Sequence, residues 1–224
     1  AKELLGDEAT LADSAKAIEL KAAKYDSATG RFVSLGTITN NEMYESQPQI
    51  SADANGVYVV WSENSENNVF GEGGTNKVYK AKYADSEWSS AVVADGLSGI
   101  SSMDAGALAD GMYVSYSENG TGKLVNLDTN VSAGLSSATN VQFGYVAGEE
   151  AVIWYNGQNV MYAEEAGVSG NVLFDKQNVS SNSYKYVSDA SGNSSIIYSC
   201  ANEGKAQIYI SDYDPSTKDW GNIQ

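Results

Sequence analysis

The side chains that could do chemistry in this chain are carboxylates, hydroxyls and aromatic rings. The sequence has no histidine, so it lacks the commonest general base and the commonest zinc ligand. Its single cysteine, Cys200, cannot form an internal disulfide, and its single arginine, Arg31, cannot build a cluster of guanidinium groups around a phosphate or carboxylate. We therefore expect no metal site and no cofactor.

Paired carboxylates are the enzymatic arrangement that this composition still permits. Glycosidases place two such groups roughly 5–10 Å apart, on either side of a sugar. Three acids hold comparable positions, but Asp53 and Asp189 stand in turn sequences. Only Asp104, in the small-residue segment SSMDAG, could line a funnel. One acid is not a pair, so we assign no catalytic residue, lean against an enzyme, and keep a carboxylate-dependent glycoside hydrolase as the alternative.

A regular set of aromatic residues closes one short pattern four times. The pattern is a turn followed by an apolar run, as in NGVYVVW (55–61) and DGMYVSY (110–116). The closing residues are Trp61, Tyr116, Trp154 and Tyr198. They could form stacking platforms for sugar rings, or they could pack between neighbouring sheets. Repetition in every copy favours packing, because packing is repeated whereas a binding site is usually asymmetric.

The acid-rich segment 63–75 is the part of the chain best suited to binding a partner. It is longer than the corresponding connection in the other repeats, and long loops in compact domains are often functional. In a propeller we expect it to lie on the same face as the turns that follow the other aromatic residues. The predicted binding residues on this face are Glu63, Glu66, Glu72, Glu118, Asn156 and Asn202.

The elements that position these residues are pairs of hairpins. The first hairpin of each pair turns at Asn-Gly, Asp-Gly or an equivalent, and the second turns at residues rich in Asp, Ser and Thr. Four short strands every 40–55 residues or so are the signature of a propeller blade. We predict an all-β fold, a β-propeller of four-stranded antiparallel blades spanning residues 17–224. Its parts are a half blade at 17–40 and blades at about 44–95, 96–139, 140–179 and 180–224, after a short helix or extension at 1–16.

About four and a half blades would leave unpaired strand edges, which invite aggregation. Two solutions remain open: a small closed ring of five blades, or a larger ring that needs further blades or domains of the same polypeptide. The start of the repeats inside a blade favours the larger ring.

The charge balance restricts the partners. With 29 acidic and 13 basic residues the net charge is −16, so the surface repels phosphate backbones and we expect no nucleic-acid partner. No apolar run approaches the length of a membrane span, so we expect no membrane insertion. A glycan or a protein remains as the partner, and the acids favour one that is neutral or basic.

Two segments carry a resemblance to a known group. The segment PQISADANGVYVVW (48–61) resembles the inner hairpin of bacterial sialidase-like propeller repeats, and YDPSTKDW (213–220) is similar to their Asp-box turn, although no stretch fits Ser-x-Asp-x-Gly-x-x-Trp fully. Sialidases of this kind hold the substrate carboxylate with three arginines and use a Tyr/Glu pair as nucleophile. One arginine cannot supply that clamp. The resemblance therefore implies a non-catalytic secreted or cell-surface module that binds a glycan or a protein.

Overall fold

The computed structural model describes residues 10–69, 73–135, 137–175, 183–202, 205–214, 216–217 and 219–221. The chain divides into two compact units, Ala1–Ile100 and Ser101–Gln224. Each unit is described by itself. Within the described ranges one short helix comes first, strands and turns follow, and no helix is long and apolar enough to cross a membrane.

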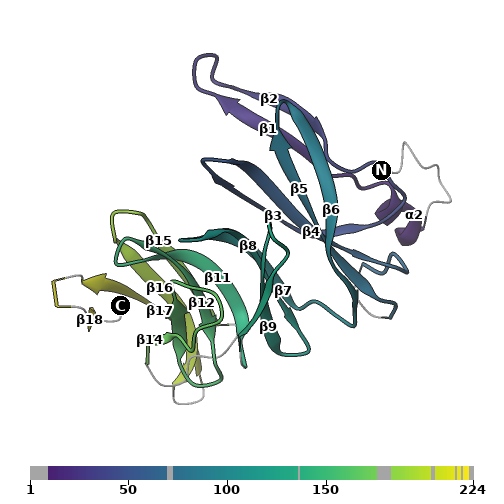
Figure 1. Ribbon diagram of the computed structural model, residues 1–224. Coiled ribbons are helices and arrows are strands. Elements are labelled where there is room, and N and C mark those ends of the chain that lie inside the picture. Colours follow the sequence, from purple (N-terminus) through teal and green to yellow (C-terminus); the bar gives the residue numbers. More distant parts are fainter. Residues whose placement is uncertain are drawn as a thin grey trace. The chain divides into compact units, whose positions relative to one another are not determined.

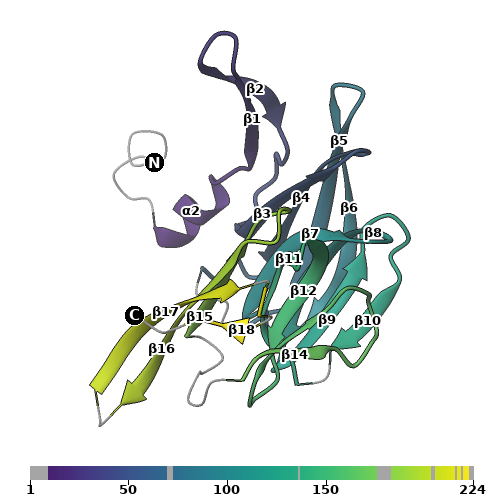
Figure 2. The same ribbon diagram turned by 90° about the vertical axis from the view of Figure 1, so that its left-hand side faces the viewer.

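The first unit holds the helix, a hairpin and one four-stranded sheet (Figures 1 and 2). Helix α2 (Leu11–Lys16) starts with a capping box, in which the Asp13 N–H donates to Thr10 Oγ1 at 3.2 Å and the Thr10 N–H donates to Asp13 Oδ2 at 2.9 Å. Among the described strands, β1 (Lys21–Asp26) and β2 (Arg31–Thr37) pair only with each other. The sheet consists of β3 (Glu45–Asp53), β4 (Gly56–Asn64), β5 (Asn76–Ala84) and β6 (Glu87–Leu97).

The second unit contains three four-stranded sheets (Figure 1). The first is formed by β7 (Ser102–Leu108), β8 (Gly111–Glu118), β9 (Thr121–Asn126) and β10 (Ser132–Leu135). The second is formed by β11 (Thr139–Val146), β12 (Glu149–Tyr155), β13 (Val160–Ala163) and β14 (Asn171–Phe174). The third is formed by β15 (Tyr184–Ser188), β16 (Ser194–Asn202), β17 (Lys205–Asp214) and β18 (Asp219–Trp220).

Neighbouring sheets of the second unit meet along their first strands. Strand β11 packs beside both β7 and β15. Side chains bond across these junctions to main-chain groups: the Phe143 N–H donates to Asp104 Oδ2 at 3.0 Å, and the Tyr186 hydroxyl donates to the Tyr145 carbonyl at 2.6 Å. Sheets that adjoin through their first strands are arranged as propeller blades are.

Apolar side chains fill the spaces between these sheets. Because successive residues of a strand point to opposite faces, β12 contributes to two cores. Val152 and Trp154 pack toward the sheet that begins with β7, whereas Ala151 and Ile153 pack toward the sheet that begins with β15. A sheet buried on both faces explains why its central strands are apolar at nearly every position.

The four four-stranded antiparallel sheets, the two-stranded sheet and the short helix confirm the predicted fold class. The four-stranded sheets fall inside or close to the ranges that the repeats predict, and the hairpin β1–β2 lies within 17–40. The single domain spanning 17–224 stays a prediction.

Candidate functional site

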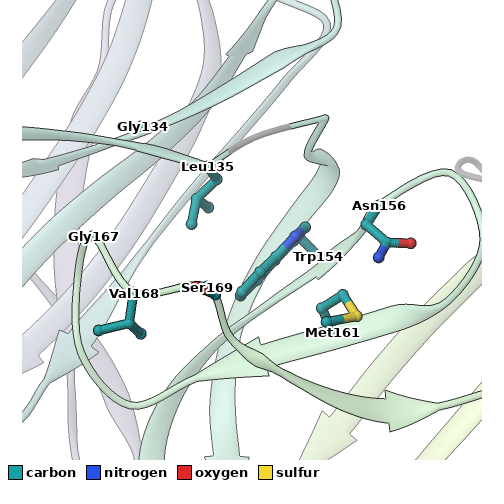
Figure 3. A pocket seen from close by; sticks show the side chains of 8 residues that line it. All are labelled: Gly134, Leu135, Trp154, Asn156, Met161, Gly167, Val168 and Ser169. Atoms are coloured by element: carbon teal, nitrogen blue, oxygen red, sulfur yellow. The ribbon is translucent and has the colours of Figure 1, made fainter.

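A cavity of about 310 Å³ lies in the second unit, beside the strands β10, β12 and β13 (Figure 3). Strand β10, the end of β12, the start of β13 and the loop between β13 and β14 line it. The lining residues are Gly134, Leu135, Trp154, Asn156, Met161, Gly167, Val168 and Ser169. None of them is charged, and the volume lies at the lower end of the range for small-molecule sites. We call this space the Trp154 cavity.

Three polar groups in the Trp154 cavity have no hydrogen-bond partner among the described residues. They are the indole N–H of Trp154, the side-chain NH₂ of Asn156 and the hydroxyl of Ser169. The other end of the Asn156 amide is occupied, because its Oδ1 accepts from the N–H groups of Gln158 and Asn159 at 3.0 and 2.8 Å. These bonds fix the Asn156 side chain and leave its donor end free.

The free indole N–H distinguishes Trp154 from the other three tryptophans. Trp61 Nε1 donates to Glu63 Oε1 at 3.0 Å. Trp88 and Trp220 donate to the carbonyls of Leu35 and Leu173 at 2.9 and 2.6 Å. Trp154 as a whole is only 3% exposed, but its Nε1 is not among the enclosed polar atoms that lack a partner, so the N–H is accessible. It is therefore a donor that a ligand in the Trp154 cavity could meet.

Gly170 holds the loop against Trp154. A Cβ at this position would lie 2.3 Å from Cη2 of the indole, and the backbone φ of +72° is in the region that favours glycine. The loop main chain can therefore approach the indole more closely than any other residue type would permit. This approach packs the Cη2–Cζ2 edge of the indole against the loop.

The structure places the predicted binding residues of the first unit in and next to β4. Glu63 is 5% exposed, and its Oε1 accepts from Trp61 and from Asn41 Nδ2, the latter at 3.2 Å. Its carboxylate is thus engaged inside the fold. Glu66 is exposed in the loop after β4, and Asn64 ties this loop down by donating to the Gly73 carbonyl at 3.0 Å. Glu72 lies outside the described residues.

The predicted binding residues of the second unit lie at the end of the second strand of each sheet or directly after it. Glu118 ends β8 and pairs with Lys123 at 3.5 Å, and Asn156 lies directly after β12 in the Trp154 cavity. Asn202 ends β16, and its side chain lies outside the described part of the structure. The structure does not bring Glu118 to the cavity. That all six residues form one partner site stays a prediction.

The four closing aromatic residues are all buried. Trp61 stacks on Tyr79 with ring centroids 5.4 Å apart, and it packs with Val59 and Ala81. Tyr198 meets Phe174 edge to face, between the last two sheets. Tyr116 is 3% exposed, and burial raises the pKa of its hydroxyl. Of the four, only Trp154 lines a described cavity.

The three acids considered for catalysis serve as hydrogen-bond acceptors. Asp53 Oδ1 accepts from the N–H groups of Asn55 and Gly56, and Asp189 Oδ1 accepts from Ser191 and Asn193. Asp104 accepts from the main chain of Ala105 and Phe143. Burial raises the pKa of Asp104 although both hydrogen bonds act to lower it, and the charged side chain that influences it is Lys185.

A group of carboxyls in the first unit influence one another. Glu45 is 3% exposed, neither of its oxygens meets a donor among the described residues, and burial together with Glu19 and Glu63 raises its pKa to about 7. Two of these three carboxyls are buried, so a sugar cannot enter between them. No group of three acidic or cysteine side chains in the described ranges is placed to hold a metal ion.

The loop residues of the Trp154 cavity, Gly167 to Ser169, are absent from the sequence predictions. No repeated motif marks them, because the loop between β13 and β14 has no counterpart of similar sequence in the other sheets. A usable signal was the spacing: seven residues, 164–170, separate β13 from β14. That length is only slightly above the usual two to five residues or so of a hairpin loop, so it is a weak signal.

No family model and no curated protein matches this chain. Among solved structures, an α-L-arabinofuranosidase from Podospora anserina, in complex with cellotriose, aligns with a TM-score of 0.45 and 9% identity, over 80% of this chain and 67% of that one. A glycosyl hydrolase from Bacteroides ovatus aligns with a TM-score of 0.44 and 11% identity, over 90% and 74%. Likeness at this level identifies neither a family nor an activity.

Proposed function

We propose that this chain is a non-catalytic carbohydrate-binding module, and that the Trp154 cavity binds a neutral sugar. The observation that carries the proposal is the accessible, unpaired indole N–H of Trp154 in a cavity that is also lined by Asn156, with its free donor end, and by Ser169, with its hydroxyl. A ligand that bonded to all three groups would carry several acceptor oxygens. Sugars present hydroxyl and ring oxygens around a C–H framework, which suits the apolar side chains of Leu135 and Met161.

The shape of the site favours a glycan over a protein partner. A stable protein–protein interface buries roughly 800 Å² on each partner, usually over a broad surface. The Trp154 cavity is concave, uncharged and about 310 Å³ in volume. An uncharged lining on a chain with a net charge of −16 also disfavours anionic sugars, because the surrounding field repels them.

The positions of the acids support binding without catalysis. Hydrolysis of a glycoside by the usual route needs two carboxyl groups on either side of the bond. The Trp154 cavity is lined by none, and Asp104 already accepts two main-chain hydrogen bonds. The resemblance to bacterial sialidase-like repeats agrees with a non-catalytic member, and we propose an extracellular or cell-surface location on that basis.

The test is a panel of neutral monosaccharides and oligosaccharides of glucose, galactose, mannose, xylose and arabinose, followed by calorimetry and tryptophan fluorescence. We expect at least one series to bind and to change the emission. Trp154→Phe removes both the donor and the reporting indole, so this variant is measured by calorimetry, where we expect weaker binding. Asn156→Asp keeps the oxygen that holds the turn but replaces the NH₂ donor, and it should weaken binding about ten-fold.

Gln158→Glu is the matched control for Asn156→Asp. Gln158 is exposed on the same turn and lines no described cavity, so this variant adds the same charge without touching the site. Equal effects of the two variants, or no binding by any member of the panel, would show that the cavity does not bind sugar. Release of reducing sugar from a bound oligosaccharide would favour the hydrolase instead.

A further inference from the structure

We propose that the ligand is a neutral oligosaccharide of two or more rings, with one ring in the Trp154 cavity and the next in an adjoining cavity. This inference rests on the proposed function and names its ligand class. The adjoining space, which we call the Glu164 cavity, has a volume of about 350 Å³. It is lined by Ala163, Glu164, Glu165, Val168, Ser169, Gly170 and Asn171.

The two cavities share a wall. Val168 and Ser169 line both of them, so this dipeptide forms a ridge between two spaces of similar size. Both residues are exposed, and Figure 3 shows them on the loop at one side of the Trp154 cavity. A ligand that fills the first space and extends past the ridge enters the second. A chain of sugar rings has this form, whereas a single ring fills one space only.

Glycines flank this ridge on both sides. Gly167 and Gly170 have φ values of +82° and +72°, so the main chain bends sharply on both sides without a bulky side chain. Ser169, whose hydroxyl is both a donor and an acceptor, lines both cavities. It can bond the linking region of an oligosaccharide whose rings lie on either side.

The second cavity differs from the first in its chemistry. The Trp154 cavity offers mainly donors, whereas Glu164 and Glu165 offer carboxylate oxygens, which accept from sugar hydroxyls. Asn171 adds an amide. The two carboxylates also repel any acidic sugar at this position. The ligand should therefore carry free hydroxyls and no carboxylate on its second ring.

Chain length and a pair of variants test this inference. Within the neutral series that binds, we expect the trisaccharide to bind at least about ten-fold more tightly than the monosaccharide. Glu164→Gln combined with Glu165→Gln should weaken binding of the trisaccharide about five-fold and leave the affinity for the monosaccharide unchanged. The matched control is Glu149→Gln with Glu150→Gln, an adjacent acidic pair on β12 that lines neither cavity.

The outcomes separate this inference from the proposed function. Equal affinity for one ring and for three would overturn the two-ring arrangement while leaving sugar binding intact. An equal loss of trisaccharide affinity in the Glu164/Glu165 double variant and in the Glu149/Glu150 control would also overturn it, because it would show a general effect of charge. Tight binding of an acidic trigalacturonate would overturn the assigned role of Glu164 and Glu165. Absence of binding by every neutral sugar would remove the proposed function and this inference with it.

Discussion

Glu45 is a buried acid with an unusual ionisation. Its pKa of about 7 lies well above the ordinary value of 4.5, because burial disfavours the charged form and Glu19 and Glu63 add their negative charges. The folded state therefore binds a proton that the unfolded state has released between these two pH values. The stabilisation from that proton is fully present below about pH 4.5 and is lost as the pH rises through about 7.

Glu45→Gln should therefore change how stability depends on pH. Below about pH 5 the variant and the parent should unfold at similar urea concentrations, since both side chains are neutral. At pH 8 the variant should be more stable by up to about 3 kcal/mol, the free energy that corresponds to the shift in pKa. Urea unfolding between pH 4.5 and 8.5 measures this. Glu87→Gln, at an exposed position of the same unit, is the control, and equal slopes for both variants would contradict the assignment.

Trp61 contrasts with Trp154, because its ring and its donor are both used inside the fold. Trp61→Ala would remove a side chain that stacks on Tyr79 and bonds to Glu63, so it should destabilise the protein by about 3–5 kcal/mol. Chemical denaturation gives the value. Because Trp61 lines no described cavity, sugar binding by the folded fraction should be unchanged. A variant with normal stability and lost binding would reverse the roles given to these two tryptophans.

At the scale of elements, Asp104 joins two sheets through the backbone of Phe143. Asp104→Ala would leave that N–H without its acceptor at the junction of β7 and β11, at a cost of about 1–3 kcal/mol. Asp104→Asn keeps an acceptor oxygen and should cost less. Thermal unfolding together with hydrogen exchange at Phe143 checks both expectations. If Asp104→Asn instead abolished a glycosidase activity at unchanged stability, the acid would be catalytic.

The elements themselves could be predicted because their signals are local. The Asn-Gly and Asp-Gly turns, and the apolar runs that end at Trp61 and Tyr116, fixed where hairpins form. The site could be predicted only in part. Asn156 follows from its place after an aromatic strand, but the free donor of Trp154 depends on which acceptors surround it. The loop that forms the ridge is brought to Trp154 by the close approach of Gly170, which no local pattern indicates.

At the scale of the whole molecule, the net charge of −16 predicts that a neutral oligosaccharide and a basic protein bind with different salt dependence. A neutral oligosaccharide exchanges no counterions when it binds, so raising NaCl from about 50 to about 500 mM should change its Kd less than two-fold or so. Binding of a basic protein would weaken strongly over the same range, because salt screens the attraction. Calorimetry at the two salt concentrations distinguishes them. A strong salt dependence for a neutral sugar would contradict the uncharged site.

The order of the strands in each sheet has a consequence for synthesis of the chain. In all four of the four-stranded sheets described here, every strand pairs with the strand next to it in the sequence. Hairpins of this kind close over short loops, so each sheet can form soon after its last strand has left the ribosome, without waiting for distant segments. The sheets can then form one after another, from the N-terminus to the C-terminus, as the chain is synthesised. A stalled nascent chain that ends after β10 would already contain a complete sheet, one face of which would not yet be covered by β11.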